Sequence, residues 1–167
     1  MQKKVLTEQS IYYGDVSMPK NWEIDPTDLA HNILHWNLTD EEFYFSRTFD
    51  KLNCYIKEHI NLKYKLNLIN KETWGDMYSP QKSSAPLLNI DPVDFRNSPD
   101  YVLLYGVKTS DCNVRIYYDD NRRKGRSWDM ELKQNMFIMF PSTNMYYITN
   151  KQKDNLNIIQ TITYESI

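Results

Sequence analysis

Apolar residues follow two different periods along this chain. In the N-terminal third they recur every three or four positions, as on one face of a helix. Asp25-Pro26 is a good helix start, because aspartate caps the first turn and proline fits the first helical position. Leu29, Ile33 and Trp36 then share one face, which predicts a helix over about 26–36.

A second stretch has the same helical spacing. Its apolar residues are Phe49, Leu52, Ile56 and Ile60, with charged residues between them. Ser46 or Thr48 precedes this stretch and is a suitable cap. A second helix is therefore expected over about 48–61.

Beyond this point the period changes to two. Tyr64, Leu66 and Leu68 alternate with polar residues, which predicts a half-buried strand, and 10–16 is a further short strand candidate. Seven more strands are expected near 86–90, 101–108, 113–118, 127–132, 135–140, 144–149 and 156–164. Short strands separated by turns, with no helices between them, are typical of a sandwich or barrel.

The predicted elements fit a single mainly-β domain of the α+β class that covers 1–167. Its N-terminal arm and helices take up 1–63, and a β core takes up 64–167. Cys54 and Cys112 lie far apart and are expected to be reduced and buried, without a disulfide.

Charge and hydropathy exclude several classes of function. The chain has 20 Lys and Arg against 22 Asp and Glu, which gives no broad field for nucleic acid or an anionic membrane. The longest apolar runs, 101–107 and 136–140, are far shorter than the ~20 residues that span a bilayer. No long apolar stretch follows the charged N-terminus, so we expect a protein that is not secreted and has no membrane partner.

Tyrosine and asparagine are abundant, with 13 and 16 copies. A genomic preference for AT-rich codons explains most of this bias, while exposed tyrosine also suits protein interfaces. The basic cluster at 122–126 is interpreted mainly as a soluble hairpin tip, with an acidic protein patch as a more plausible partner than nucleic acid. The candidate interface residues are Tyr12, Tyr13, Arg122, Arg123, Arg126, Trp128 and Tyr147.

An ordered series of segments in the C-terminal half carries a family resemblance. The segments are 105–109, 114–120, 135–142 and 157–164, and the most specific is the strand that ends in Phe140-Pro141-Ser142. The series resembles the double-stranded β-helix, or jelly roll, of small 2-oxoglutarate/iron(II) oxygenases from bacteria and from tailed marine phages of the myovirus type. The resemblance implies a jelly-roll core over roughly 85–165 with the two N-terminal helices packed on it.

The resemblance also implies where a metal site would lie. The family holds iron with a His-X-Asp or His-X-His motif on an early strand and a later histidine, and an arginine beyond it binds 2-oxoglutarate. Aligned with the family, the early motif falls on Asp94-Phe95-Arg96, the later histidine near Tyr146 and the arginine around 155–157. None of these positions is a histidine or the required arginine, and no histidine follows His59. The alignment thus predicts a degenerate metal site at Asp94, Arg96 and Tyr146, with no metal and no cofactor.

Other residues with reactive side chains have simpler interpretations. His31 and His35 have a metal-binding spacing, but the Asn-Ile-Leu between them lacks the glutamate of a zinc protease, so exposed helix residues are expected. His59 near a helix end is interpreted as structural. Four glycines leave no phosphate-binding loop, and the adjacent carboxylates at 41–42 and 119–120 are expected to be solvated.

Three functions follow from these expectations. The first is a non-enzymatic phage structural or assembly protein, associated with the neck, tail or head. Its partners would be other virion proteins or itself, in a homo-oligomer or ring, and it would lie in the virion or, during assembly, in the host cytoplasm. The alternative is a divergent 2-oxoglutarate/iron-dependent oxygenase, a hydroxylase, that takes its ligands from His31, His35 or His59. The third is a cupin-like binder of small ligands without chemistry.

Overall fold

Two α-helices, one short 3-10 helix and nine strands make up the described part of the molecule, which is a computed structural model. The structure describes residues 3–5, 8–16, 24–39, 47–118 and 125–167. The helices are α1 (Pro26–Thr39), α2 (Arg47–Tyr64) and the short 3-10 helix η1 (Phe95–Asn97). The strands are β1 (Tyr12–Asp15), β2 (Leu68–Tyr78), β3 (Lys82–Ser83), β4 (Tyr101–Lys108), β5 (Cys112–Tyr117), β6 (Ser127–Glu131), β7 (Met136–Pro141), β8 (Tyr146–Asn150) and β9 (Asn157–Ser166).

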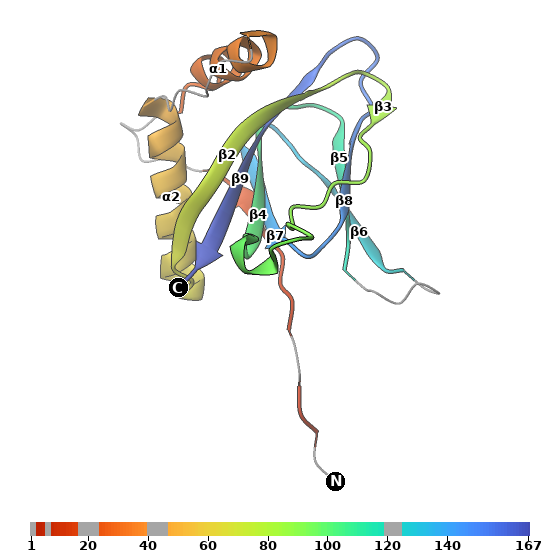
Figure 1. The fold of residues 1–167 in the computed structure, drawn as a ribbon. Coiled ribbons are helices and arrows are strands. Elements are labelled where there is room, and N and C mark those ends of the chain that lie inside the picture. Colours follow the sequence, from red (N-terminus) through yellow and green to blue (C-terminus); the bar gives the residue numbers. More distant parts are fainter. Residues whose placement is uncertain (1–2, 6–7, 17–23, 40–46, 119–124) are drawn as a thin grey trace.

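The strands form two antiparallel sheets that face each other as a jelly roll. One has the order β1-β7-β4-β9-β2 and the other the order β3-β8-β5-β6. Both helices lie on the outer side of the five-stranded sheet (Figure 1), and in the described part of the chain no helix covers the four-stranded sheet. The α+β, mainly β jelly roll with two N-terminal helices is therefore confirmed.

Alternate side chains of the five-stranded sheet enter two separate cores. Leu103 and Tyr105 of β4 pack towards the helices, in a core shared with Ile33 and Ile56. Val102 and Leu104, on the other face of β4, pack inside the barrel against the four-stranded sheet. The period of two along a strand produces this division, since successive side chains point to opposite faces.

Helix α1 packs closely on β2 because residue 75 has no side chain. A Cβ built on Gly75 would lie 2.2 Å from Ile33 Cγ1, so only glycine permits this approach. Helix α2 is attached to β9 by a buried hydrogen bond, in which the Tyr164 hydroxyl donates to Asn53 Oδ1 at 2.7 Å. Burial raises the pKa of Tyr164, so this phenol stays protonated and remains a donor.

The helices and most strands lie close to their predicted positions, including the short strand in 10–16. The strand predicted to begin at Tyr64 is wrong at its start, because α2 continues to that residue. Lys65 then ends the helix in a left-handed conformation, with φ of 58°, and the strand starts at Leu68. The strand predicted at 86–90 is also wrong: only an isolated bridge joins Leu87 to Tyr146.

The remaining comparisons with the sequence predictions concern β3, the two cysteines and the length of the helices. The structure has the short strand β3 in a segment for which no strand was predicted. Both cysteines are free, and Cys112 is buried as expected, but Cys54 is exposed on α2. None of the helices among the described residues is both long and apolar enough to cross a bilayer.

Candidate functional site at the barrel mouth

A row of side chains from β2 lines the inside of the barrel. Trp74 pairs with Thr161, Asp76 with Ile159 and Tyr78 with Asn157 in the β2–β9 ladder. Directly paired residues of an antiparallel ladder point to the same face. Tyr78 and Ile159 both belong to the inner core, so the row that includes Trp74 and Asp76 points inward too.

Asp76 is the more buried of the two carboxylates in this inner row, which also contains Glu72. Its Oδ2 accepts a hydrogen bond of 3.0 Å from Trp74 Nε1. Burial raises the pKa of Asp76, and the Trp74 hydrogen bond partly opposes that shift. Burial also raises the pKa of Tyr78 and of Tyr146, and the Asp76 charge adds to both shifts. Burial in the inner wall thus disfavours the charged forms of these side chains.

Tyr146, the predicted site of the later histidine, stands at the start of β8 and is buried. Its backbone exchanges hydrogen bonds of 2.9 and 3.0 Å with Leu87. Its hydroxyl donates to Asn89 Oδ1 at 2.9 Å, and its ring packs edge-on against Phe140 at 5.0 Å between centroids. The segment that contains Leu87 and Asn89 therefore meets strand β8 here, and the Tyr146 phenol is hydrogen-bonded to the Asn89 amide.

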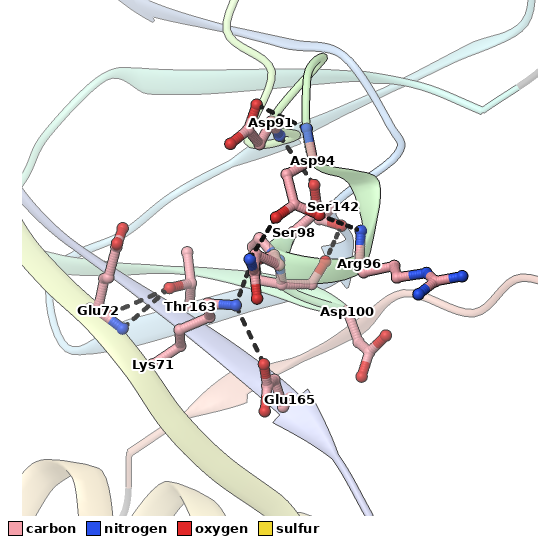
Figure 2. Close-up of polar contacts among 12 residues, drawn as sticks. Lys71, Glu72, Asp91, Asp94, Arg96, Ser98, Asp100, Ser142, Thr163 and Glu165 are labelled. Carbon is pink, nitrogen blue, oxygen red and sulfur yellow. Dashed lines mark hydrogen bonds and ion pairs between the residues drawn. The ribbon is translucent and has the colours of Figure 1, made fainter.

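Arg96 lies on η1 and Asp94 is the N-cap of η1, both downstream of Asn89. The Asp94 carboxylate caps η1 by accepting from the backbone N–H of Arg96 at 3.2 Å and from the side chain of Asn97. The Arg96 side chain is exposed and points away from Asp94 in Figure 2. Neither residue hydrogen-bonds Tyr146, so the structure does not bring the three predicted positions together as one polar cluster.

A cavity of about 310 Å³ opens at this end of the barrel. Glu72, Trp74 and Thr163 line one side of it, and Asn89 and Ser98 line part of the other. Lys71 closes it by bonding Glu165 Oε1 at 3.0 Å and the Asn97 carbonyl (Figure 2). Its lining is therefore mainly polar and mixed in charge, without a histidine or cysteine.

The opposite end of the inner wall is the region where the family's arginine is expected. Asn157 is fully buried there, and its Oδ1 accepts from the Ser110 N–H at 3.0 Å and from Gln152 Nε2 at 2.6 Å. Asn157 Nδ2 has no partner. Neighbouring Asn150 donates to the carbonyls of Tyr78 and Asn155 at 2.9 and 2.8 Å. Uncharged amides thus occupy this region and bind mostly protein atoms.

The predicted interface residues are dispersed over the molecule. Tyr12 packs edge-on against Tyr64 and Tyr101, with centroid distances of 4.8 and 6.2 Å. Tyr13 and Trp128 contact each other at 5.4 Å and connect edge strands β1 and β6. Tyr147 contacts Tyr117 at 5.7 Å on the uncovered face of the four-stranded sheet, and Arg126 is exposed. Arg122 and Arg123 lie outside the described residues.

All three histidines of the sequence lie on the helices. His31 and His35 are exposed on α1, and His59 is exposed on α2, where it stacks on Tyr55 at 5.7 Å. Both helices cover the outer side of the five-stranded sheet, so that sheet separates the three imidazoles from the inner wall (Figure 1).

No protein-family model and no curated protein sequence matches this chain. Solved structures do match its fold. The prolyl-4-hydroxylase of Pseudomonas putida aligns with a TM-score of 0.65 at 12% identity, over 94% of this chain and 85% of that one. The viral collagen prolyl hydroxylase of Paramecium bursaria Chlorella virus-1, solved with 2-oxoglutarate, aligns with a TM-score of 0.62 at 12% identity, over 94% and 96%. The fold is that of the 2-oxoglutarate/iron(II) oxygenases.

A third structure of this fold has different chemistry. The α-ketoglutarate-dependent epimerase SnoN of nogalamycin biosynthesis aligns with a TM-score of 0.64 at 7% identity, over 93% of this chain and 77% of that one. The shared architecture thus includes proteins named for hydroxylation and for epimerisation.

The fold implies iron, but the donor atoms of this chain do not match it. Iron in such enzymes takes two imidazoles and a carboxylate on one face. Among the described residues no group of three or more His, Cys, Asp or Glu side chains is placed to hold a metal ion. Asp76 would supply one carboxylate, while the phenol and amide of Tyr146 and Asn89 bond to each other.

Sequence reasoning missed Trp74, Asp76, Tyr78 and Asn89. The alternation at positions 72, 74, 76 and 78 was the available signal, because it predicts a strand with one inward face. Polar Glu72 and Asp76 obscured that signal, since a core-facing row is normally apolar.

Proposed function

We propose that this protein uses an oxygenase-like barrel without iron, as a non-enzymatic scaffold that binds other proteins. The observation that carries the proposal is the position of the histidines. All three lie on α1 and α2, on the outer side of the sheet, while the inward row of β2 offers carboxylates at Glu72 and Asp76 and no imidazole. Burial raises the pKa of Asp76 and so disfavours its ionised form, which is the form that a divalent cation needs as a ligand.

The state of the barrel mouth supports the same proposal. Tyr146 and Asn89 satisfy each other's polar atoms, and Asp94 is engaged in capping η1. These groups bind protein atoms and are not preorganised around an external ion. The virion or assembly role expected from the phage resemblance is one setting for such a scaffold, and mass spectrometry of purified virions tests it.

The second candidate is a divergent 2-oxoglutarate/iron-dependent hydroxylase. The fold favours this candidate, because the similar solved structures include prolyl hydroxylases. It requires an iron site with Asp76 as the barrel carboxylate and with non-histidine ligands. The comparisons thus favour an oxygenase, and the positions of the ligand residues favour a scaffold.

Iron binding separates the two candidates. Purified full-length protein is loaded anaerobically with Fe(II) and 2-oxoglutarate, and bound iron and succinate formation are measured. We expect less than a tenth of an equivalent of tightly bound iron and no succinate above the level of a heat-denatured sample. One iron per chain with turnover, both abolished by Asp76→Asn, would replace the scaffold proposal with the oxygenase.

A further inference from the structure

The segment between β3 and β4 exposes large apolar side chains. Val93 is 92% exposed, Phe95 71% and Leu88 52%. Single exposed apolar residues are common on protein surfaces, but several on one short segment mark an interaction site. We call residues 91–96 the mouth loop, because this part of the segment borders the cavity at the barrel mouth.

The mouth loop is held in one conformation by its own hydrogen bonds. Asp91 Oδ1 accepts from the N–H groups of Val93 and Asp94 at 2.8 and 3.1 Å, and Asp91 N–H donates to Ser98 Oγ at 2.8 Å. The next residues are fixed to the barrel by Lys71, which binds the Asn97 carbonyl (Figure 2). A preorganised loop loses little conformational entropy on binding, so its exposed apolar groups are suited to docking.

An apolar groove lies at the other end of β4, beside α1. Ala30, Leu34, Val107 and Ile158 give it apolar walls, and its volume is about 300 Å³. Its remaining lining residues are Pro26, Thr27, His31, Lys108 and Gln134. We call this the α1 groove. It has the room and the apolar lining to accept an aromatic side chain.

The mouth loop and the α1 groove each carry charged groups of both signs that groups on the other surface can pair. The loop flanks Val93 and Phe95 with the carboxylates of Asp91 and Asp94, and its exposed Arg96 follows Phe95. Among the described residues the groove is lined by exposed Lys108 and by no carboxylate, while Asp25, which caps α1, and Asp28, in its first turn, lie nearby. A second groove, beside α2, is less suitable for binding the mouth loop, because its lining includes both a lysine, Lys57, and a carboxylate, Glu58.

We propose that the mouth loop of one copy of this protein docks into the α1 groove of a second copy. The two sites lie beyond opposite ends of β4, whose eight residues span roughly 25 Å, so a mouth loop does not reach the groove of its own chain. The contact is therefore head-to-tail, and repetition of such a contact builds a ring or an open chain of subunits. The inference concerns the surface alone, so it stands or fails independently of iron binding in the barrel.

The mass of the full-length protein in solution tests the proposal. A loop-in-groove contact is at the small end of specific interfaces, so sedimentation velocity should show association at about 10–300 µM protein. The double variant Val93→Ser/Phe95→Ser should weaken association at least about tenfold, as loss of a central anchor does. Both residues are exposed, so circular dichroism should show an unchanged fold.

A matched control removes an exposed apolar residue elsewhere. Leu62→Ser on α2 removes a side chain that is 72% exposed and lines the α2 groove, and it should leave association unchanged. A monomer at every concentration would overturn the proposal. Association that survives the loop variant, or that Leu62→Ser abolishes, would overturn it as well.

A mixing experiment tests the head-to-tail geometry. Lys108→Glu places a carboxylate opposite Asp91 and Asp94, so this groove variant alone, like the loop variant, should associate at least about tenfold more weakly than the wild type. In a mixture, the intact groove of the loop variant should accept the intact loop of the groove variant and give a heterodimer that grows no further. If neither variant binds the other, the contact is not between these two surfaces.

Discussion

Ile33 of α1 occupies the space where a side chain on residue 75 would lie. A Cβ on Gly75 would be 2.2 Å from Ile33 Cγ1 and 2.7 Å from both Ile33 Cγ2 and Cδ1. Helix α1 and strand β2 are therefore in direct contact, and the position of the helix depends on the absence of one methyl group.

Gly75→Ala should destabilise the protein by about 1–3 kcal/mol, because the added methyl group overpacks the contact and must displace α1. The matched control is Gly14→Ala in β1, where a Cβ would meet only Phe137 Cε1, at 3.9 Å. Urea denaturation should show a lower free energy of unfolding for the first variant and little change for the second. Equal effects would mean that α1 adjusts to the methyl group without cost.

Asp76→Asn should make the folded state more stable at pH 7 and give a higher Tm. Burial raises the pKa of Asp76 in the folded state, so as pH rises the unfolded chain ionises first and folding becomes less favourable. Asparagine keeps an oxygen acceptor for Trp74 Nε1 and does not ionise. The gain should disappear below the ordinary aspartate pKa, where both states are protonated.

Thermal melts of wild type and Asp76→Asn from pH 3 to pH 8 measure this dependence. Asp154→Asn, in an exposed loop, is the control for removing one charge. A wild type that is more stable than Asp76→Asn at pH 7 would show that the carboxylate is ionised and stabilised by a partner.

Tyr146→Phe should cost about 1 kcal/mol, because the ring still packs on Phe140 while the hydrogen bond to Asn89 is lost. Tyr13→Phe is the control, since that tyrosine is 54% exposed and its ring contact with Trp128 is kept. Chemical denaturation of both variants measures the difference. If Tyr146→Phe left the free energy of unfolding unchanged, Asn89 would have another hydrogen-bond partner at the barrel mouth.

Tyr164 and Asn53 should show strong energetic coupling. Tyr164→Phe and Asn53→Ala each leave one buried polar group unpaired and should each cost about 1–3 kcal/mol. In the double variant both polar groups of the hydrogen bond are absent, so the combined loss should be smaller than the sum. A double-mutant cycle measures the coupling energy, and simple additivity would contradict a direct bond between these side chains.

The sequence predicted the regular parts of the fold well. β4 has the predicted bounds 101–108, because a continuous apolar run between turn residues is a strong strand signal. The strand start at Tyr64 was missed because the left-handed conformation of Lys65, and not the apolar period, ends α2. Predictions based on local pattern are thus least accurate where one residue's backbone conformation decides the boundary.

The candidate site was harder to predict than the fold. Tyr146 meets Asn89 across two segments that are distant in sequence, and no local signal reports such a contact. The degenerate site at Asp94, Arg96 and Tyr146 remains a prediction. In the structure Asp94 caps η1, and the Tyr146 hydroxyl donates a hydrogen bond to Asn89.

The place of β9 in the five-stranded sheet has a consequence for the rate of folding. β9 lies between β4 and β2, and strands β3 to β8 separate it from β2 along the chain. The ladder that aligns Leu68 with Ser166 therefore closes a long loop before its contacts contribute stability. Proteins dominated by such non-local pairs fold in about milliseconds to seconds, far more slowly than helical bundles. Until β9 pairs, both β2 and β4 have an unpaired edge, and the half-folded chain is most prone to aggregate in that interval.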